Sequence, residues 1–229
     1  MSPEPDLKTV RIWDLPTRLF HWLLVLTVIA SVISGEIGGN AMVWHTRLGL
    51  VALALLAFRL VWGFAGGYWS RFTAFLYGPR SVMAYLRGDS GPGGRFDIGH
   101  SPVGSLSVWA LLGLLVVQVT TGLVADDEIA TTGPLNRFVA GSTATLASGW
   151  HKSVGKSLLI VLAIAHVAAV LYYLWRKQRN LIAPMIHGDM RAPVDALASK
   201  DGAGQRLTAL LIAAAAAGLA WWIGSLETA

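Results

Sequence analysis

The chain of 229 residues contains no cysteine. This absence excludes disulfide bonds, cysteine-ligated iron–sulfur clusters, thiolate zinc sites and the covalent attachment of a c-type heme through a Cys-x-x-Cys-His motif. Charge is also scarce, since Asp, Glu, Lys and Arg together make up 14% of the residues. Any metal or redox chemistry in this protein must therefore use ligands other than thiolates, and a largely apolar chain must hold them.

The apolar residues, 54% of the chain, are gathered in blocks rather than alternating with charge. Blocks of about 18 or more apolar residues are long enough to cross the hydrocarbon core of a bilayer as helices. Helices are expected because backbone groups in lipid must pair within the segment. The first block lacks a small-residue cleavage site after it, so we expect it to be retained. The sequence predicts five spans, near residues 19–34, 45–63, 105–124, 151–175 and 207–224.

The connections between these spans differ in composition. Residues 64–105 form a long connection whose middle, residues 72–86, mixes aromatic residues with arginines and predicts an interfacial helix. A glycine-rich turn is expected over residues 89–99. Residues 125–149 and 176–206 are predicted to be polar connections.

Lys and Arg are distributed unevenly among the connections. The N-terminal segment carries three, residues 64–105 carry four and residues 176–206 carry six, whereas the first connection carries none and the third only Arg137. Basic connections stay in the cytoplasm. We therefore expect a multi-pass protein of the bacterial inner membrane with a cytoplasmic N-terminus and an outer C-terminus. The net charge of +5 arises beside the spans, which favours contact with membrane lipid and no nucleic-acid partner.

Four of the six histidines lie in or at the ends of predicted spans, where ionisable residues are rare and usually functional. His21 is near the cytoplasmic start of the first span, and His45 and His151 are at the outer starts of the second and fourth. His166 follows His151 by 15 residues. That separation is about 22 Å along an α-helix, so His166 is predicted near the cytoplasmic side, at the same depth in the membrane as His21. It is about 60° around the helix axis, so His151 and His166 are predicted to share a face of the helix.

The depths therefore match in two pairs, His45 with His151 outside and His21 with His166 inside. Each pair draws its members from two helices, as a bis-histidine heme within a helical bundle requires. The sequence predicts two non-covalent b-type hemes with these four histidines as the iron ligands. His100 and His187 fall in cytoplasmic connections, where solvated or capping roles are expected.

The two outer histidines open similar segments, Trp44-His45-Thr46-Arg47-Leu48-Gly49 and Trp150-His151-Lys152-Ser153-Val154-Gly155. Each glycine follows its histidine by one turn on the same face, which leaves room for a porphyrin edge. Close packing of helices at small residues is the alternative explanation. Heme propionates attract cations, although snorkelling at helix ends explains each of these cations individually. The outer candidates are Arg47, Lys152 and Lys156, and the inner ones are Arg18 and Arg59.

Several pieces of the sequence together resemble the prokaryotic cytochrome b561 family, which includes the cytochrome b subunits of membrane-bound nickel–iron hydrogenases. The resemblance covers about residues 10–190, and its strength lies in the order and spacing of the pieces. Ser101 departs from the pattern, since family sequences often have Asn there. The matching pieces are residues 10–14 and 18–22, Trp44-His45 with Gly49, residues 59–63 and 99–104, His151 with Gly155, His166, and residues 185–188.

The resemblance implies a four-helix diheme b cytochrome that exchanges electrons with quinone and a redox partner. Its axial ligands match His21, His45, His151 and His166, the same four that the depths select. We therefore expect an all-α integral membrane protein, a four-helix transmembrane bundle holding two hemes, with a fifth C-terminal transmembrane helix. The expected division is a cytochrome b561-like domain over residues 1–190 and a linker with the extra helix over residues 191–229, an anchor or a docking helix.

A bis-histidine heme has no open coordination site and so favours electron transfer. The expected function is electron transport between the quinone pool and a redox partner, either a periplasmic c-type cytochrome or a dehydrogenase or hydrogenase subunit. No catalytic residue is assigned, and both the enzymatic status and a homodimer stay open. Polar candidates near a quinone on the cytoplasmic side are Asp14, His100 and Arg18.

Two alternatives compete with this hypothesis. A stand-alone superoxide:quinone oxidoreductase of the same family would suit the cluster of Arg47, Lys152 and Lys156, because a cationic mouth attracts a small anion. A transporter or channel would use the membrane histidines as proton relays. The transporter hypothesis leaves the matched depths of the histidines unexplained. Transporters also favour helices that are broken at mid-membrane, whereas the apolar runs of this chain contain no proline.

Overall fold

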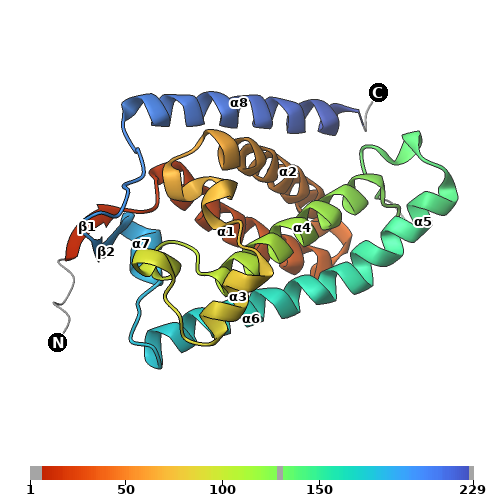
Figure 1. The fold of residues 1–229 in the computed structure, drawn as a ribbon. Helices are drawn as coiled ribbons and strands as arrows, with labels where there is room; N and C mark the ends of the chain where they lie inside the picture. Colours follow the sequence, from red (N-terminus) through yellow and green to blue (C-terminus); the bar gives the residue numbers. More distant parts are fainter. Residues whose placement is uncertain (1–6, 128–130, 227–229) are drawn as a thin grey trace. The chain divides into compact units, whose positions relative to one another are not determined.

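The computed structural model describes residues 7–127 and 131–226. Within that part of the chain, five helices are long and apolar enough to cross a membrane, which confirms the five predicted spans and the all-α membrane fold. Leu26, Ile164 and Leu211 on these helices are each 64% exposed, as expected of side chains that face lipid. The helices are α1 Leu15–Ile37, α2 Met42–Ala65, α4 Pro102–Val124, the compound helix Gly141–Trp175 and α8 Ala203–Ser225 (Figure 1).

Side-chain caps define where two of the spanning helices begin. The Asp14 carboxylate accepts a hydrogen bond from the backbone N–H of Thr17 at 2.8 Å, at the start of α1. The Ser101 hydroxyl accepts one from the N–H of Gly104 at 3.1 Å, at the start of α4. Asn caps helices as well as Ser does, so Ser101 keeps a role that Asn could serve in the family sequences.

The connection between α2 and α4 is less helical than the sequence predicts. The interfacial helix expected over residues 72–86 is confined to α3, Pro79–Leu86, and Phe72–Phe75 forms a separate 3₁₀ turn. Gly78 has an extended backbone, and proline is favoured in the first turn of a helix because its missing N–H is not needed there. Gly78 and Pro79 therefore set the start of α3. A 3₁₀ segment, Pro92–Asp97, lies in the glycine-rich turn.

The fourth spanning helix is compound. It consists of α5 Gly141–Gly149, a π-helix over Trp150–Gly155 and α6 Lys156–Trp175. The prediction of a polar connection up to residue 149 was wrong for α5, because its small residues include no proline or charge that would end a helix. The π-helix has i→i+5 bonding, so the α-helical depth and angle derived between His151 and His166 do not hold along it.

The chain divides into two compact units, each described here by itself. The first comprises residues 1–19, 60–109 and 166–210. In it, β1 Leu7–Arg11 pairs antiparallel with β2 Asp189–Pro193, with Leu7 opposite Pro193 (Figure 1). α7 Ile182–His187 ends at Gly188, whose φ of +95° suits glycine. The sequence did not predict this pairing, which extends past residue 190; the division into domains at 190 stays a prediction.

The second unit comprises residues 20–59, 110–165 and 211–229. Its core is formed by Leu56 of α2, Leu115 of α4 and Leu159 of α6, against which Leu24 and Val28 of α1 pack. Four spanning helices therefore meet in this unit as a bundle, in agreement with the predicted four-helix arrangement.

Candidate functional site

The imidazoles of His45 and His151 lie close together in the second unit. Their ring centroids are 5.8 Å apart, and the ring planes are inclined by 86°. A metal–imidazole nitrogen bond is about 2.0 Å long, which puts the centroids of two imidazoles on opposite sides of one metal ion about 6 Å apart. The observed spacing therefore suits two axial ligands of one iron, one from α2 and one from the compound helix.

Both rings are oriented by backbone carbonyl groups of neighbouring helices. His45 Nδ1 lies 2.9 Å from the carbonyl oxygen of Ser31 in α1, and His151 Nδ1 lies 2.8 Å from that of Gln118 in α4. A carbonyl oxygen can only accept, so each Nδ1 carries the proton and donates it. Each Nε2 is left with its lone pair, which is the form of imidazole that binds a metal.

Two glycines make room for these rings. A Cβ atom at Gly35 would lie 3.1 Å from His45 Nδ1, and one at Gly122 would lie 2.8 Å from His151 Cε1. Each glycine lies in the same helix as the carbonyl that binds the corresponding Nδ1. Sequence reasoning missed both residues. A glycine inside a helical pattern can indicate that another group approaches the backbone closely. Gly113 of α4 shows the same pattern, however, and a Cβ at that position would meet nothing within 4 Å.

Gly49 and Gly155, predicted to clear space for a porphyrin edge, have different surroundings. A Cβ at Gly49 would meet nothing within 4 Å. A Cβ at Gly155 would lie 2.1 Å from Gln118 Oε1 and 2.6 Å from Trp150 Nε1, two buried polar atoms that have no hydrogen-bond partner. The region thus offers open space beside His45 and an unsatisfied donor and acceptor beside His151, features that fit a bound macrocycle with polar substituents.

The three predicted outer cations, Arg47, Lys152 and Lys156, have different surroundings. The Arg47 guanidinium lies 5.2 Å from the centre of the Trp44 ring, and Lys156 Nζ lies 2.5 Å from Glu36 Oε1. Lys152 is exposed. The Lys156 charge is thus compensated by a carboxylate, and its role toward a propionate stays a prediction.

The predicted inner ligands fall in different units. His21 is half-buried in α1 and lies edge-on to Trp22, with ring centroids 5.0 Å apart. His166 is half-buried in α6, in the first unit. Their pairing therefore stays a prediction. Arg18, the predicted inner cation, donates to the carbonyl oxygen of Ile186.

Asp14, one of the polar candidates for a quinone, is fully buried and occupied by structural contacts. Its carboxylate also accepts from Trp62 Nε1 at 3.2 Å, from the N–H of Gly67 at 2.9 Å and from the hydroxyl of Ser70 at 2.6 Å. These donors account for both of its oxygens, which indicates a structural role. His100 is packed between Trp13 and Phe75, with centroid distances of 4.7 and 4.5 Å.

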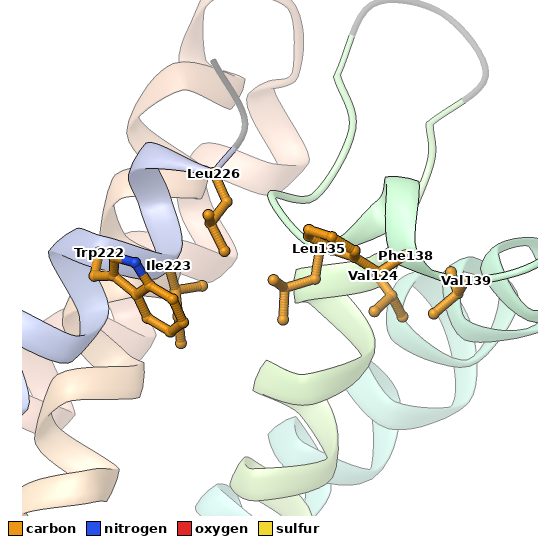
Figure 2. A pocket seen from close by; sticks show the side chains of 7 residues that line it. All are labelled: Val124, Leu135, Phe138, Val139, Trp222, Ile223 and Leu226. Atoms are coloured by element: carbon orange, nitrogen blue, oxygen red, sulfur yellow. The ribbon is translucent and has the colours of Figure 1, made fainter. Parts of the chain in front are cut away.

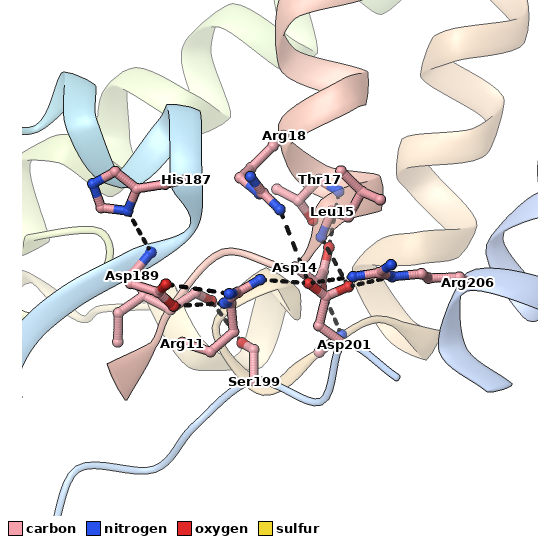
Figure 3. A network of polar contacts seen from close by, with 12 residues as sticks. Arg11, Asp14, Leu15, Thr17, Arg18, His187, Asp189, Ser199, Asp201 and Arg206 are labelled. Carbon is pink, nitrogen blue, oxygen red and sulfur yellow. Dashed lines mark hydrogen bonds and ion pairs between the residues drawn. The ribbon is translucent and has the colours of Figure 1, made fainter. Parts of the chain in front are cut away.

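Asp201 is the centre of an ion-pair network in the first unit (Figure 3). Burial by itself raises the pKa of Asp201, but the Leu15 N–H and the guanidinium groups of Arg206 and Arg11 outweigh burial and lower it. Arg11 Nη1 lies 2.8 Å and Arg206 Nε 3.3 Å from this carboxylate. An ionised Asp201 thus ties β1 and the start of α1 to the beginning of α8.

An apolar groove of about 520 Å³ lies in the second unit (Figure 2). The described residues that line it, Trp222 included, present only apolar atoms to the groove, so they offer no hydrogen bond to orient a quinone head group. Its lining residues are Val124, Leu135, Phe138, Val139, Trp222, Ile223 and Leu226.

Across residues 7–127 and 131–226, no group of three or more His, Cys, Asp or Glu side chains is arranged to hold a metal ion. A heme needs no such group, because the porphyrin supplies four nitrogens and the protein one or two axial ligands. The His45–His151 pair is therefore the arrangement of the second unit that fits this cofactor.

Comparison with known proteins shows which family the chain resembles. The family model of prokaryotic cytochrome b561 matches residues 12–188. The chain is 23% identical over 214 residues to the "Probable Ni/Fe-hydrogenase 1 B-type cytochrome subunit" of Escherichia coli (strain K12), covering 77% of this chain and 88% of that protein. It is 22% identical over 216 residues to the "Probable Ni/Fe-hydrogenase B-type cytochrome subunit" of Cupriavidus necator, covering 80% and 87%. Since the family match spans most of the chain and all four predicted histidine ligands, the chain belongs to the prokaryotic cytochrome b561 family, whose b-type heme and electron transfer through a multi-pass membrane protein it shares.

Proposed function

We propose that the protein is a diheme b-type cytochrome that carries electrons between the quinone pool and a redox partner. The observation that supports this most strongly is the His45–His151 pair, with both Nδ1 atoms bonded to carbonyl groups. Bound heme b supplies a reversible one-electron couple at its iron. The chain's own contribution would be to hold the His45 and His151 imidazoles in the tautomer that binds iron, so that both would ligate the iron and keep oxygen and substrate from it.

The second heme would use His21 and His166. Both are half-buried histidines of spanning helices, where an ionisable residue without a function is costly. Arg18 would serve this heme as the nearby cation. With one heme near each surface, electrons could cross the bilayer without leaving the bundle.

The partner and the membrane follow from different observations. The relatives named above are called hydrogenase cytochrome subunits, which favours a hydrogenase as redox partner over a periplasmic c-type cytochrome or another dehydrogenase. The distribution of Lys and Arg favours the bacterial inner membrane with a cytoplasmic N-terminus, so the His45–His151 heme would lie at the outer face. Residues 191–229 would then supply an additional anchor or a docking helix.

Heme stoichiometry tests the proposal directly. The full chain, purified in detergent, is assayed by pyridine hemochrome and by a reduced-minus-oxidised spectrum. Two low-spin b-type hemes per chain are expected. One heme would show that one histidine pair is structural, and no heme in protein expressed with ample heme would overturn the proposal and favour a proton-relay transporter.

A superoxide:quinone oxidoreductase is the second candidate. Arg47 and Lys152 are exposed beside the His45–His151 pair and could attract a small anion, whereas Lys156 is compensated by Glu36. Rapid heme reduction by superoxide in the purified chain, in the absence of any partner, would favour this candidate over the electron-transfer subunit.

A further inference from the structure

Gln118 contacts His151 at two points. Its backbone carbonyl accepts the Nδ1 proton of the imidazole at 2.8 Å, and its side-chain Nε2 donates to the backbone carbonyl of His151 at 2.9 Å. One residue of α4 therefore holds both the ring and the main chain of this histidine. A histidine fixed at both points has little freedom to rotate or to shift along its helix.

The second of these bonds falls in the π-helix Trp150–Gly155. A π-helical turn interrupts the regular i→i+4 pattern of a helix and often occurs at functional sites. The Gln118 amide gives the His151 carbonyl a partner from outside the helix at this point. The side chain thereby stabilises the turn that carries the axial ligand.

Gly155 makes this arrangement sterically possible. The amide oxygen of Gln118 lies 2.1 Å from where a Cβ at Gly155 would be. Any side chain at residue 155 must therefore displace the Gln118 amide. At Gly49, the corresponding position after His45, a Cβ would meet nothing within 4 Å.

We infer that Gln118 is a positioning residue for the axial ligand His151, and that it sets the affinity and electronic state of the heme bound there. The inference rests on the proposed function, because it requires a heme at the His45–His151 pair. Hydrogen bonds to the groups around a metal ligand commonly change metal affinity by about 10- to 100-fold. The effect should be confined to one heme, since the backbone carbonyl and the side-chain amide of Gln118 both bond to His151.

The test compares Gln118→Met, which keeps the length of the side chain but loses its amide, with Gly155→Ala, which keeps the amide but displaces it. Both variants should release one heme about 10-fold faster to an apo-globin acceptor. Both should also shift the low-spin EPR signal of that heme while leaving the other unchanged. Gly113→Ala and Thr120→Val are matched controls in the same helix as Gln118, since a Cβ at Gly113 would meet nothing within 4 Å and the Thr120 hydroxyl donates to carbonyls of its own helix.

The outcomes separate this inference from the proposed function. A wild-type chain without heme would overturn both. Two hemes in the wild type, with unchanged release and EPR signals in both variants, would overturn the role of Gln118 alone. Loss of both hemes together in Gln118→Met, with normal behaviour of Gly155→Ala, would assign Gln118 to general folding and would also overturn it.

Discussion

The segments that begin at Trp44 and Trp150 have the same pattern of Trp, His and Gly but different conformations. The first lies in the regular helix α2, directly after a 3₁₀ turn at Gly39–Ala41. The second forms a π-helix between α5 and α6. Trp44 is exposed, whereas the indole nitrogen of Trp150 is buried. A repeated sequence pattern thus places a histidine twice at the start of a predicted span, while the neighbouring residues decide how each histidine is held.

The difference has a physical origin in what precedes each histidine. His45 is the fourth residue of α2, which directly follows the short 3₁₀ turn Gly39–Ala41, so no long helix before it sets its register. His151 follows nine residues of α5, whose register is already set. A π-turn inserts an extra residue per turn and so turns a side chain relative to the preceding helix. Gln118 then bonds to the carbonyl of the histidine in this turn.

The largest effect is expected from removing either histidine of the pair. His45→Ala and His151→Ala should each lose one heme b and keep the other, because each leaves the same iron with one protein ligand. The double variant should lose no more than either single variant. Pyridine hemochrome per chain measures this, and a double variant that lacks both hemes while each single variant lacks one would contradict the pairing.

A smaller effect is expected from the glycines beside the two rings. Gly122→Ala should lower heme occupancy more than Gly35→Ala, since its Cβ would lie 2.8 Å rather than 3.1 Å from a ring atom. Ala is a better helix former than Gly by about 1 kcal/mol, so helix propensity alone would act in the opposite direction.

Gly113→Ala is the matched control for this comparison, because it lies in α4 with open space at its Cβ position. Heme titration of the three variants gives the order. Equal occupancy in Gly122→Ala and Gly113→Ala would show that the close approach to His151 does not constrain the ligand.

The smallest effect is expected from the cations of the two segments. Glu36→Gln removes the partner of Lys156, and this partly exposed ion pair should contribute about 0.2–1 kcal/mol to the free energy of unfolding. Arg47→Gln removes an exposed cation–π contact with Trp44, worth about 0.5–1 kcal/mol. Thermal unfolding at low and high salt distinguishes them, because salt should abolish the Glu36 effect. A Glu36→Gln difference that persists in high salt would show that Glu36 stabilises the fold by something other than its ion pair with Lys156.

The spans were predictable from the sequence because lipid imposes a length and an apolar composition on any helix that crosses it. α1, α2, α4 and α8 each begin three or four residues before the predicted start, since caps such as Asp14 and Ser101 lie outside the apolar runs. The β1–β2 pair was not predictable. Its strands are five residues long and are separated by most of the chain.

The sequence by itself determined that the chain is a helical membrane protein and that four of its six histidines occupy spanning helices, because both properties depend on local composition and spacing. Only the tertiary structure decided which glycines clear space for the rings. Gly113 and Gly122 look alike in the sequence, and only Gly122 faces a histidine of another helix. The tertiary structure also decided that Gln118 contacts His151, 33 residues away. Such contacts depend on how helices rotate against one another, and that rotation is set by packing over the whole bundle rather than by any one segment.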